Sequence, residues 1–235
     1  MRRIHLLALL ITAAFTAGCA GKNTVVEPYT VPMPTIITAA EWGSNPDSLV
    51  GREHTPKFAT IHHAGVNWKP TDDPVAKLQG LQSWGKRDKQ WPDVPYHYLI
   101  SPDGNIYEGR NTTYEPETNT NYDTSGTINI HLWGNFDNQR ATLEQIASTV
   151  AITAYVCQRY NISPETIGGH KDRVGPGETS CPGNDLYRYI ENGSMQQWVE
   201  ETLAGEQPVI ALLDPLPEGP YIFIGQPLPE ETSTP

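Results

Sequence analysis

Three residues of the 235-residue chain have side chains that suit a metal ion. His62 opens a His-His pair at the end of a predicted strand, His170 follows two glycines in a loop, and Cys181 lies eleven residues further on, before a Pro-Gly pair. Two imidazoles and one thiolate suit zinc, and three protein ligands leave a fourth position for water or substrate. No CxxC or HExxH spacing fixes these residues as ligands. Ordinary surface or core histidines and a buried thiol therefore remain the alternative from residue types alone.

The other histidines have less specific patterns. Because side chains alternate along a strand, His63 faces away from His62, and we expect it to be structural, with His63 as the ligand in place of His62 as the alternative. His97 is expected to be buried and hydrogen-bonded. His131 is not expected to be a ligand, and His54 is expected to be solvated.

The three cysteines separate by context. Cys157 lies on the apolar stripe of a predicted helix, where a free cysteine behaves as a small hydrophobic residue. A Cys157–Cys181 disulfide is its rival interpretation, because an oxidising compartment permits it, and that disulfide would remove the metal site. Cys19 belongs to the N-terminal segment treated below.

Alternating strand and helix patterns between residues 36 and 203 must position these side chains. Period-two patterns predict strands at residues 58–63, 96–100, 106–108 and 127–133. Caps at Asp73 and Thr142 predict the starts of two helices, and a last helix is predicted over 184–203. The Asp-Gly turn between the second and third strands makes one pair antiparallel. We therefore expect a single α/β domain with a central mixed β-sheet flanked by helices.

The two ends of the chain differ from this domain. Residues 1–18 read as a signal peptide, and a small-residue pair directly before Cys19 resembles a lipobox, which predicts lipidation of Cys19. Residues 19–35 are predicted to be a tether, and the proline-rich, acidic residues 204–235 a tail, whose stretch 222–224 suits a docked edge strand. This pattern predicts a periplasmic protein anchored to the outer membrane, in contact with the membrane through lipid alone.

The charge excludes one class of partner. Sixteen Lys plus Arg against 27 Asp plus Glu give a net charge of −11, and loss of Arg2 and Arg3 with the signal peptide makes it −13. Nucleic-acid binding needs a basic face, so we expect no nucleic-acid partner. We expect a monomer.

Seven short motifs together resemble one family. They occur in the order Ile37–Gly43 (ITAAEWG), Ile61–Ala64 (IHHA), Pro95–Ile100 (PYHYLI), Asp103–Arg110 (DGNIYEGR), Gly134–Phe136 (GNF), Gly169–Asp172 (GHKD) and Cys181–Tyr187 (CPGNDLY). In this order they are similar to the zinc-dependent N-acetylmuramoyl-L-alanine amidases of type 2, a family that includes the peptidoglycan recognition proteins. The similarity spans about residues 37–195.

This resemblance implies a zinc ion held by His62, His170 and Cys181. It implies hydrolysis of the amide between N-acetylmuramic acid and L-alanine in peptidoglycan, with Tyr96 and Thr179 donating hydrogen bonds to the oxyanion. Non-catalytic members of the family lack the cysteine, so Cys181 favours an enzyme. The alternative is a non-catalytic lipoprotein that tethers the outer membrane to the wall.

The remaining expectations concern substrate contacts. Trp68 and Trp91 are candidates to stack on the glycan strand, and Arg110 to pair with a stem-peptide carboxylate, with a surface salt bridge as the alternative. Tyr96 and Glu108 are candidates for the general base. The sequence departs from the animal members in lacking a Gly-x-His segment before the Gly-Asn-Phe motif, and this departure affects the wall of the substrate groove.

Overall fold

A computed structural model describes residues 29–47 and 51–227 of the chain. The signal peptide and Cys19 lie outside these residues. The central sheet has six strands in the order β1-β4-β3-β5-β2-β6, and all neighbouring pairs are parallel except β3 with β4. The strands are β1 (Ile36–Ile37), β2 (Phe58–His63), β3 (Tyr98–Ile100), β4 (Ile106–Glu108), β5 (Thr127–Leu132) and β6 (Gly168–Gly169). The predicted mixed α/β sheet is confirmed.

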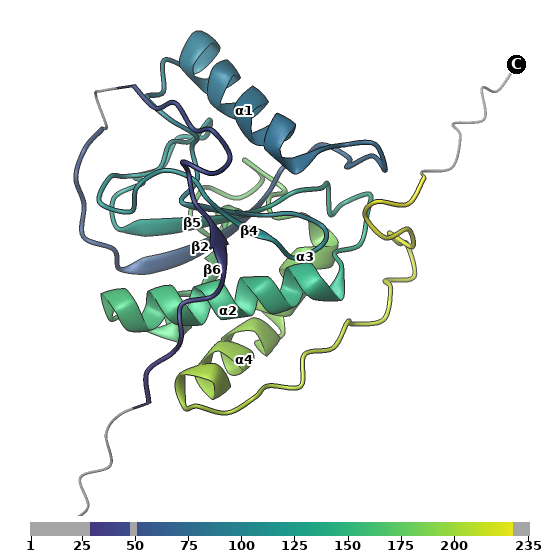
Figure 1. Cartoon of the computed structure of the whole chain (residues 1–235). Coiled ribbons are helices and arrows are strands. Elements are labelled where there is room, and N and C mark those ends of the chain that lie inside the picture. The colour runs from purple at the N-terminus through teal and green to yellow at the C-terminus, as the bar shows by residue number, and fades with distance from the viewer. Residues whose placement is uncertain (1–28, 48–50, 228–235) are drawn as a thin grey trace, which may run out of the picture.

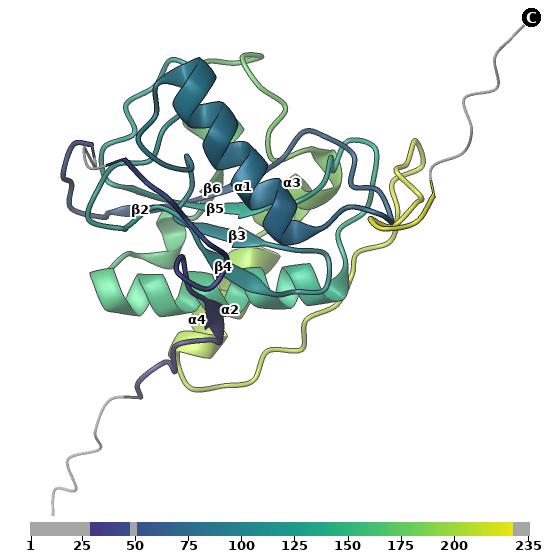
Figure 2. The same ribbon diagram turned by 45° about the horizontal axis from the view of Figure 1, so that its top comes forward.

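Helices cover the sheet on both faces. Figures 1 and 2 show α1 on one side of the sheet and α2 with α4 on the other. The helices are α1 (Pro74–Trp84), α2 (Leu143–Tyr160), α3 (Asn184–Glu191) and α4 (Ser194–Leu203). Among the described residues, no helix is long and apolar enough to cross a membrane.

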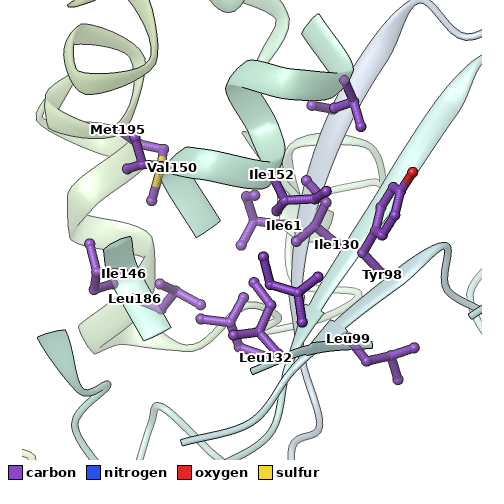
Figure 3. Close-up of a cluster of buried hydrophobic side chains, with 14 of the residues drawn as sticks. Ile61, Tyr98, Leu99, Ile130, Leu132, Ile146, Val150, Ile152, Leu186 and Met195 are labelled. Carbon is purple, nitrogen blue, oxygen red and sulfur yellow. The ribbon is translucent and has the colours of Figure 1, made fainter. Parts of the chain in front are cut away.

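The face of the sheet toward α2 is apolar. Ile61, Ile130 and Leu132 have no exposed surface, and they pack with Ile146 and Ile152 of α2, as Figure 3 shows. Full burial of one such side chain contributes about 1.5–3 kcal/mol to folding. This layer therefore fixes β2 and β5, and with them His62 and His131.

The opposite face of the same strands is polar. In the parallel register of β2 and β5, Thr60 lies beside Asn129, and His62 lies beside His131. All four side chains are buried. Because side chains alternate along a strand, the sequence that places Ile61 and Ile130 toward α2 places His62 and His131 toward α1.

The predicted helix starts are confirmed. Asp73 accepts a hydrogen bond from Ala76 N at 2.8 Å at the start of α1. Thr142 and Gln145 form a capping box at the start of α2. The single helix predicted over 184–203 is wrong, because Gly193, with φ of +80°, separates α3 from α4. An L-residue rarely adopts this conformation, and glycine does so without steric cost.

Parts of the predicted tether and tail pack on the domain. Val31 is 5% exposed, and its N–H donates to Gln158 Oε1 on α2 at 2.8 Å. In the tail, Leu213 N donates to the hydroxyl of Tyr189 at 2.9 Å, and Phe223 forms a parallel bridge with Arg140. The predicted edge contact of residues 222–224 is thus present as a single bridge.

Candidate metal centre and adjoining cavity

His62, His170 and Cys181 come together on the polar face of the sheet. One ligand atom from each lies within 4.8 Å of the others, and all three residues are buried. The Cys181 Sγ lies 3.7 Å from His62 Nδ1, and the two imidazole centroids are 4.7 Å apart. Ligands distant in the sequence therefore form one compact group, as the sequence predicted.

Local contacts tie the three ligand-bearing segments together. Lys171 N donates to the carbonyl of Cys181 at 2.9 Å, and His63 N donates to the Cys181 Sγ at 3.4 Å. Position 169 requires glycine, because a Cβ there would lie 2.6 Å from Pro182 Cδ. The glycine before His170 thus allows the Cys181–Pro182 turn to approach β6.

Burial sets the protonation of the candidate ligands. Burial lowers the pKa of His170 to about 4, and burial together with the neighbouring His170 lowers the pKa of His62 well below its usual value. Both imidazoles are therefore neutral at pH 7 and have a free lone pair. Burial raises the pKa of the Cys181 thiol to about 12, and a metal ion opposes this shift because its ligand is the thiolate.

The structure distinguishes His62 from His63. The His63 imidazole is absent from the cluster, and its Nδ1 accepts a hydrogen bond from Phe136 N at 3.2 Å. His97 is fully buried and hydrogen-bonded through both nitrogens, to Tyr114 O and Asn129 N. His54, expected to be solvated, is half-buried, and its ring nitrogens contact Thr112 O and Gly126 N.

The Cys157–Cys181 disulfide does not form. Both residues are free thiols in the described part of the chain. Cys157 is 2% exposed on the face of α2 that packs into the apolar core, as its helix pattern indicated.

Tyr96 lies near the three candidate metal ligands because β3 begins later than predicted. Strict alternation from Tyr98 would turn Tyr96 toward α2, but β3 starts at Tyr98 and the preceding residues are irregular. The Tyr96 ring stacks on His131 at 4.2 Å and lies 5.2 Å from the ring of His62. Burial, with Cys181 nearby, raises the pKa of Tyr96 above its usual value, so its hydroxyl stays a donor.

Thr179 lies beside the cysteine ligand. Its Oγ1 accepts a hydrogen bond from Cys181 N at 3.1 Å, and the residue is partly exposed. The hydroxyl proton is not used by this bond, so Thr179 retains a donor next to the cluster.

An aromatic cavity of about 320 Å³ adjoins the cluster through Tyr96. Trp68 and Trp91 both line it, 7% and 8% exposed. Sequence reasoning missed Trp84 and Asn119, which line the cavity together with Trp133 and His131. The strand pattern of residues 127–133 indicated burial for Trp133, and nothing in it distinguished a cavity wall from a core position.

Arg110 does not face this cavity. It is 2% exposed, and its guanidinium donates to the carbonyl of Glu115 at 2.6 Å and to Glu117 Oε1 at 3.1 Å. The expected direct contact with a stem-peptide carboxylate is therefore corrected to an internal ion pair. Glu108 also lies apart, accepting from Ala39 N beside β1 at the opposite edge of the sheet from β6.

Three residues near the ligands escaped sequence reasoning. Thr120 and Tyr122 lie in a loop without hydrophobic periodicity, so no pattern pointed to them. Asn129 is on the polar face of β5, and alternation with Ile128 and Ile130 was the signal that places it there.

Comparison with known sequences identifies the family. The family described as N-acetylmuramoyl-L-alanine amidase matches residues 52–184, more than half of the chain. The chain belongs to this amidase family. The matched region includes His62, His170 and Cys181, so the cluster lies within the shared part of the sequence.

Relatives of this family member include animal recognition proteins and a bacterial endolysin. Peptidoglycan-recognition protein SC2 of Drosophila melanogaster is 31% identical over 163 residues, which cover 68% of this chain and 86% of that protein. The crystal structure of Drosophila peptidoglycan recognition protein SD aligns with a TM-score of 0.59 at 24% identity, over 67% of this chain and 93% of that one. The endolysin amidase LysCS of Clostridium intestinale URNW also gives 0.59 at 24% identity, over 71% and 98%. These two structures support the fold.

Proposed function

We propose that the protein is a zinc-dependent N-acetylmuramoyl-L-alanine amidase that cleaves the amide between N-acetylmuramic acid and L-alanine in peptidoglycan. The observation that carries the proposal is the buried group of His62, His170 and Cys181, whose ligand atoms lie within 4.8 Å of one another beside an aromatic cavity. The family match supports the same chemistry.

The chemistry of the donors fits zinc. Two neutral imidazoles and a thiolate form a set of intermediate softness, and three ligands are the number found in catalytic zinc sites. When bound, zinc supplies Lewis-acid chemistry: it lowers the pKa of water and polarises a carbonyl.

Tyr96 and Thr179 supply the hydrogen-bond donors of the proposed site. The Tyr96 ring lies 5.2 Å from the ring of His62, and the Thr179 hydroxyl is bonded to the backbone of Cys181. Burial raises the pKa of Tyr96, so its hydroxyl is protonated at neutral pH. Donors already held in place stabilise a developing oxyanion, and loss of one such donor costs about 10²–10³ in rate. The proposal therefore gives Tyr96 the role of a donor.

The aromatic cavity fits the glycan part of the substrate. Trp68 and Trp91 offer ring faces, and the cavity shares Tyr96 with the ligand cluster. A sugar stacked in this cavity therefore lies directly beside the group that hydrolyses its lactyl amide. The stem peptide then extends away from the cavity.

A non-catalytic peptidoglycan-binding lipoprotein is the second candidate. Its support is the relative at 31% identity, which is named as a recognition protein. The complete ligand set favours the enzyme, because binding peptidoglycan alone needs no thiolate beside two imidazoles.

We also propose that the protein acts as a monomer anchored by a lipid at Cys19 to the outer membrane, on its periplasmic side. The support is the N-terminal sequence pattern. The first described residue, Tyr29, contacts α2, because its carbonyl accepts a hydrogen bond from Gln158 Nε2 at 3.0 Å. Helix α1 lies on the other side of the sheet (Figure 1). Cys19→Ser is expected to move the protein from the membrane fraction to the soluble fraction.

A soluble N-acetylmuramoyl-L-alanyl peptide tests the proposed reaction. We expect the zinc-loaded protein to release a peptide with a free L-alanine amino terminus, and a chelator to stop the release until zinc is restored. Binding of the same peptide without any release, in protein that contains zinc, would support the recognition protein instead.

A further inference from the structure

The loop of residues 118–122 contacts one of the candidate metal ligands. Thr120 Oγ1 lies 2.6 Å from Nε2 of His170, and the ring of Tyr122 lies 5.3 Å from the same imidazole. This loop lies between β4 and β5 in the chain and contains no helix or strand. A segment outside the sheet therefore holds one ligand of the cluster.

The Thr120 hydroxyl is itself held in place. Its Oγ1 lies 2.8 Å from the Oγ1 of Thr118, and its backbone N–H donates to the same oxygen at 3.1 Å. His170 is 8% exposed, so this contact is largely shielded from water. A hydroxyl fixed by a second threonine has a defined direction and can orient the ring it touches.

Imidazole chemistry gives this contact a consequence. A neutral imidazole carries its proton on one nitrogen and offers a lone pair on the other, and the partner of the protonated nitrogen decides which is which. Histidine ligands commonly donate this second N–H to an oxygen, and loss of that oxygen costs about 10–100-fold in metal affinity. When the Thr120 oxygen accepts the proton of Nε2, the lone pair is on Nδ1.

We propose that Thr120 is a positioning residue of the metal centre: its Oγ1 accepts the Nε2 proton of His170 and so selects the tautomer that binds metal through Nδ1. The inference rests on the metal-binding part of the proposed function.

Three variants of the full chain test the proposal. Thr120→Val keeps the shape of the side chain and removes the hydroxyl, whereas Thr120→Ser keeps the hydroxyl. Thr124→Val is the matched control, because Thr124 lies in the same connection and its Oγ1 donates to Glu115 Oε2 at 3.2 Å rather than to a ligand. Zinc affinity is measured by competition with a chromophoric chelator, and the thermal midpoint of each metal-free protein checks its folding.

We expect Thr120→Val to bind zinc about 10–100-fold more weakly, and Thr120→Ser and Thr124→Val to stay close to the unaltered protein. Long-range ¹H–¹⁵N NMR spectra of the metal-free protein report the tautomer, and Thr120→Val is expected to lower the population protonated at Nε2 of His170.

Three results distinguish a failure of this inference from a failure of the proposed function. If the unaltered protein binds zinc and Thr120→Val binds it equally well, the role of Thr120 is wrong and the metal site stands. Equal losses in Thr120→Val and Thr120→Ser would also overturn the hydrogen-bond role. If the unaltered protein binds no zinc, the proposed function fails and this inference fails with it.

Discussion

The two faces of the central sheet come from the same strands and differ in what burial requires of them. Toward α2, Ile61, Ile130 and Leu132 are buried by other apolar side chains, and this face needs only shape and volume. Toward α1, His62 and Asn129 are buried as well, but polar groups inside a protein need partners.

On the polar face some of these partners are absent among the described residues. The Nε2 of His62, the Nδ2 of Asn129 and the hydroxyl of Tyr122 are buried, and none has a partner of good hydrogen-bond geometry there. Buried polar atoms without partners are costly, so a fold retains them where they serve another purpose. The apolar face therefore stabilises the sheet, whereas the polar face holds buried polar groups that can bind a ligand.

The largest expected effect is on the polar face, at Cys181. We expect Cys181→Ser to lose stoichiometric zinc and to lower the rate of muramoyl-peptide cleavage by about 10³ or more, since a metal ion contributes several kcal/mol to stabilising the transition state. Metal content and cleavage rate are the measurements. Cleavage at the unaltered rate would remove the metal assignment.

Cys157→Ser is the matched control on the apolar face. Cys157 is equally a buried free thiol, but it lies on α2 and packs into the apolar core. A buried hydroxyl there is expected to lower the free energy of unfolding by about 1–3 kcal/mol and to leave zinc content unchanged.

The next largest effect is on the apolar face, at Ile130. We expect Ile130→Ala to lower the free energy of unfolding by about 2–5 kcal/mol, because the side chain has no exposed surface and its removal leaves a cavity. Urea unfolding measures it. His131→Leu, one residue along and facing α1, is the comparison. Both its ring nitrogens lack a partner within the described chain, so an apolar replacement is expected to cost less. A larger loss from His131→Leu would contradict the division between the faces.

A smaller effect concerns acid stability through His97. Burial lowers the pKa of His97 to about 3, below the ordinary value of about 6.5, so the folded state favours the neutral ring. Its contribution to stability is complete above pH 6.5 and is lost as the pH falls from 6.5 toward 3, by at most about 1.4 kcal/mol per pH unit.

The variant His97→Gln isolates this contribution. It is expected to be less stable than the unaltered protein at pH 7.5, and the difference between the two is expected to shrink as the pH falls to 4.5. Urea unfolding at several pH values measures both. Two stability curves that stay parallel over this range would contradict the assignment to His97.

The smallest expected effect is at the start of α2, the helix that covers the apolar face. Thr142 Oγ1 accepts from Gln145 N at 3.0 Å. Thr142→Ala is expected to lower the free energy of unfolding by about 1 kcal/mol without changing zinc affinity, and Thr142→Ser to restore it. A change in zinc affinity would show that the two faces are coupled through α2.

Local patterns were sufficient for the parts of the fold that depend on neighbouring residues. The alternation of residues 58–63 predicted both β2 and the opposite directions of His62 and His63, and the cap at Asp73 predicted the start of α1. The break at Gly193 was missed because the apolar spacing continues through it, and its left-handed backbone is a property of the turn.

The site was predictable where a motif carried it and unpredictable where a loop did. His170 and Cys181 belong to short motifs, whereas Thr120 reaches His170 through a loop whose path depends on tertiary contacts. The family resemblance placed Tyr96 correctly beside the candidate metal ligands, yet strict strand alternation would have turned it toward α2. Arg110 has the charge for a substrate contact, but no local sequence pattern predicted its burial among backbone carbonyls.

The most direct test of the central claim is to digest intact peptidoglycan sacculi with the zinc-loaded protein and identify the products by mass spectrometry, with Cys181→Ser as the control. The account predicts peptides that begin with free L-alanine together with glycan strands that have lost their peptides, and neither product from Cys181→Ser. Unchanged sacculi in the presence of zinc, or cleavage at a different bond, would contradict it.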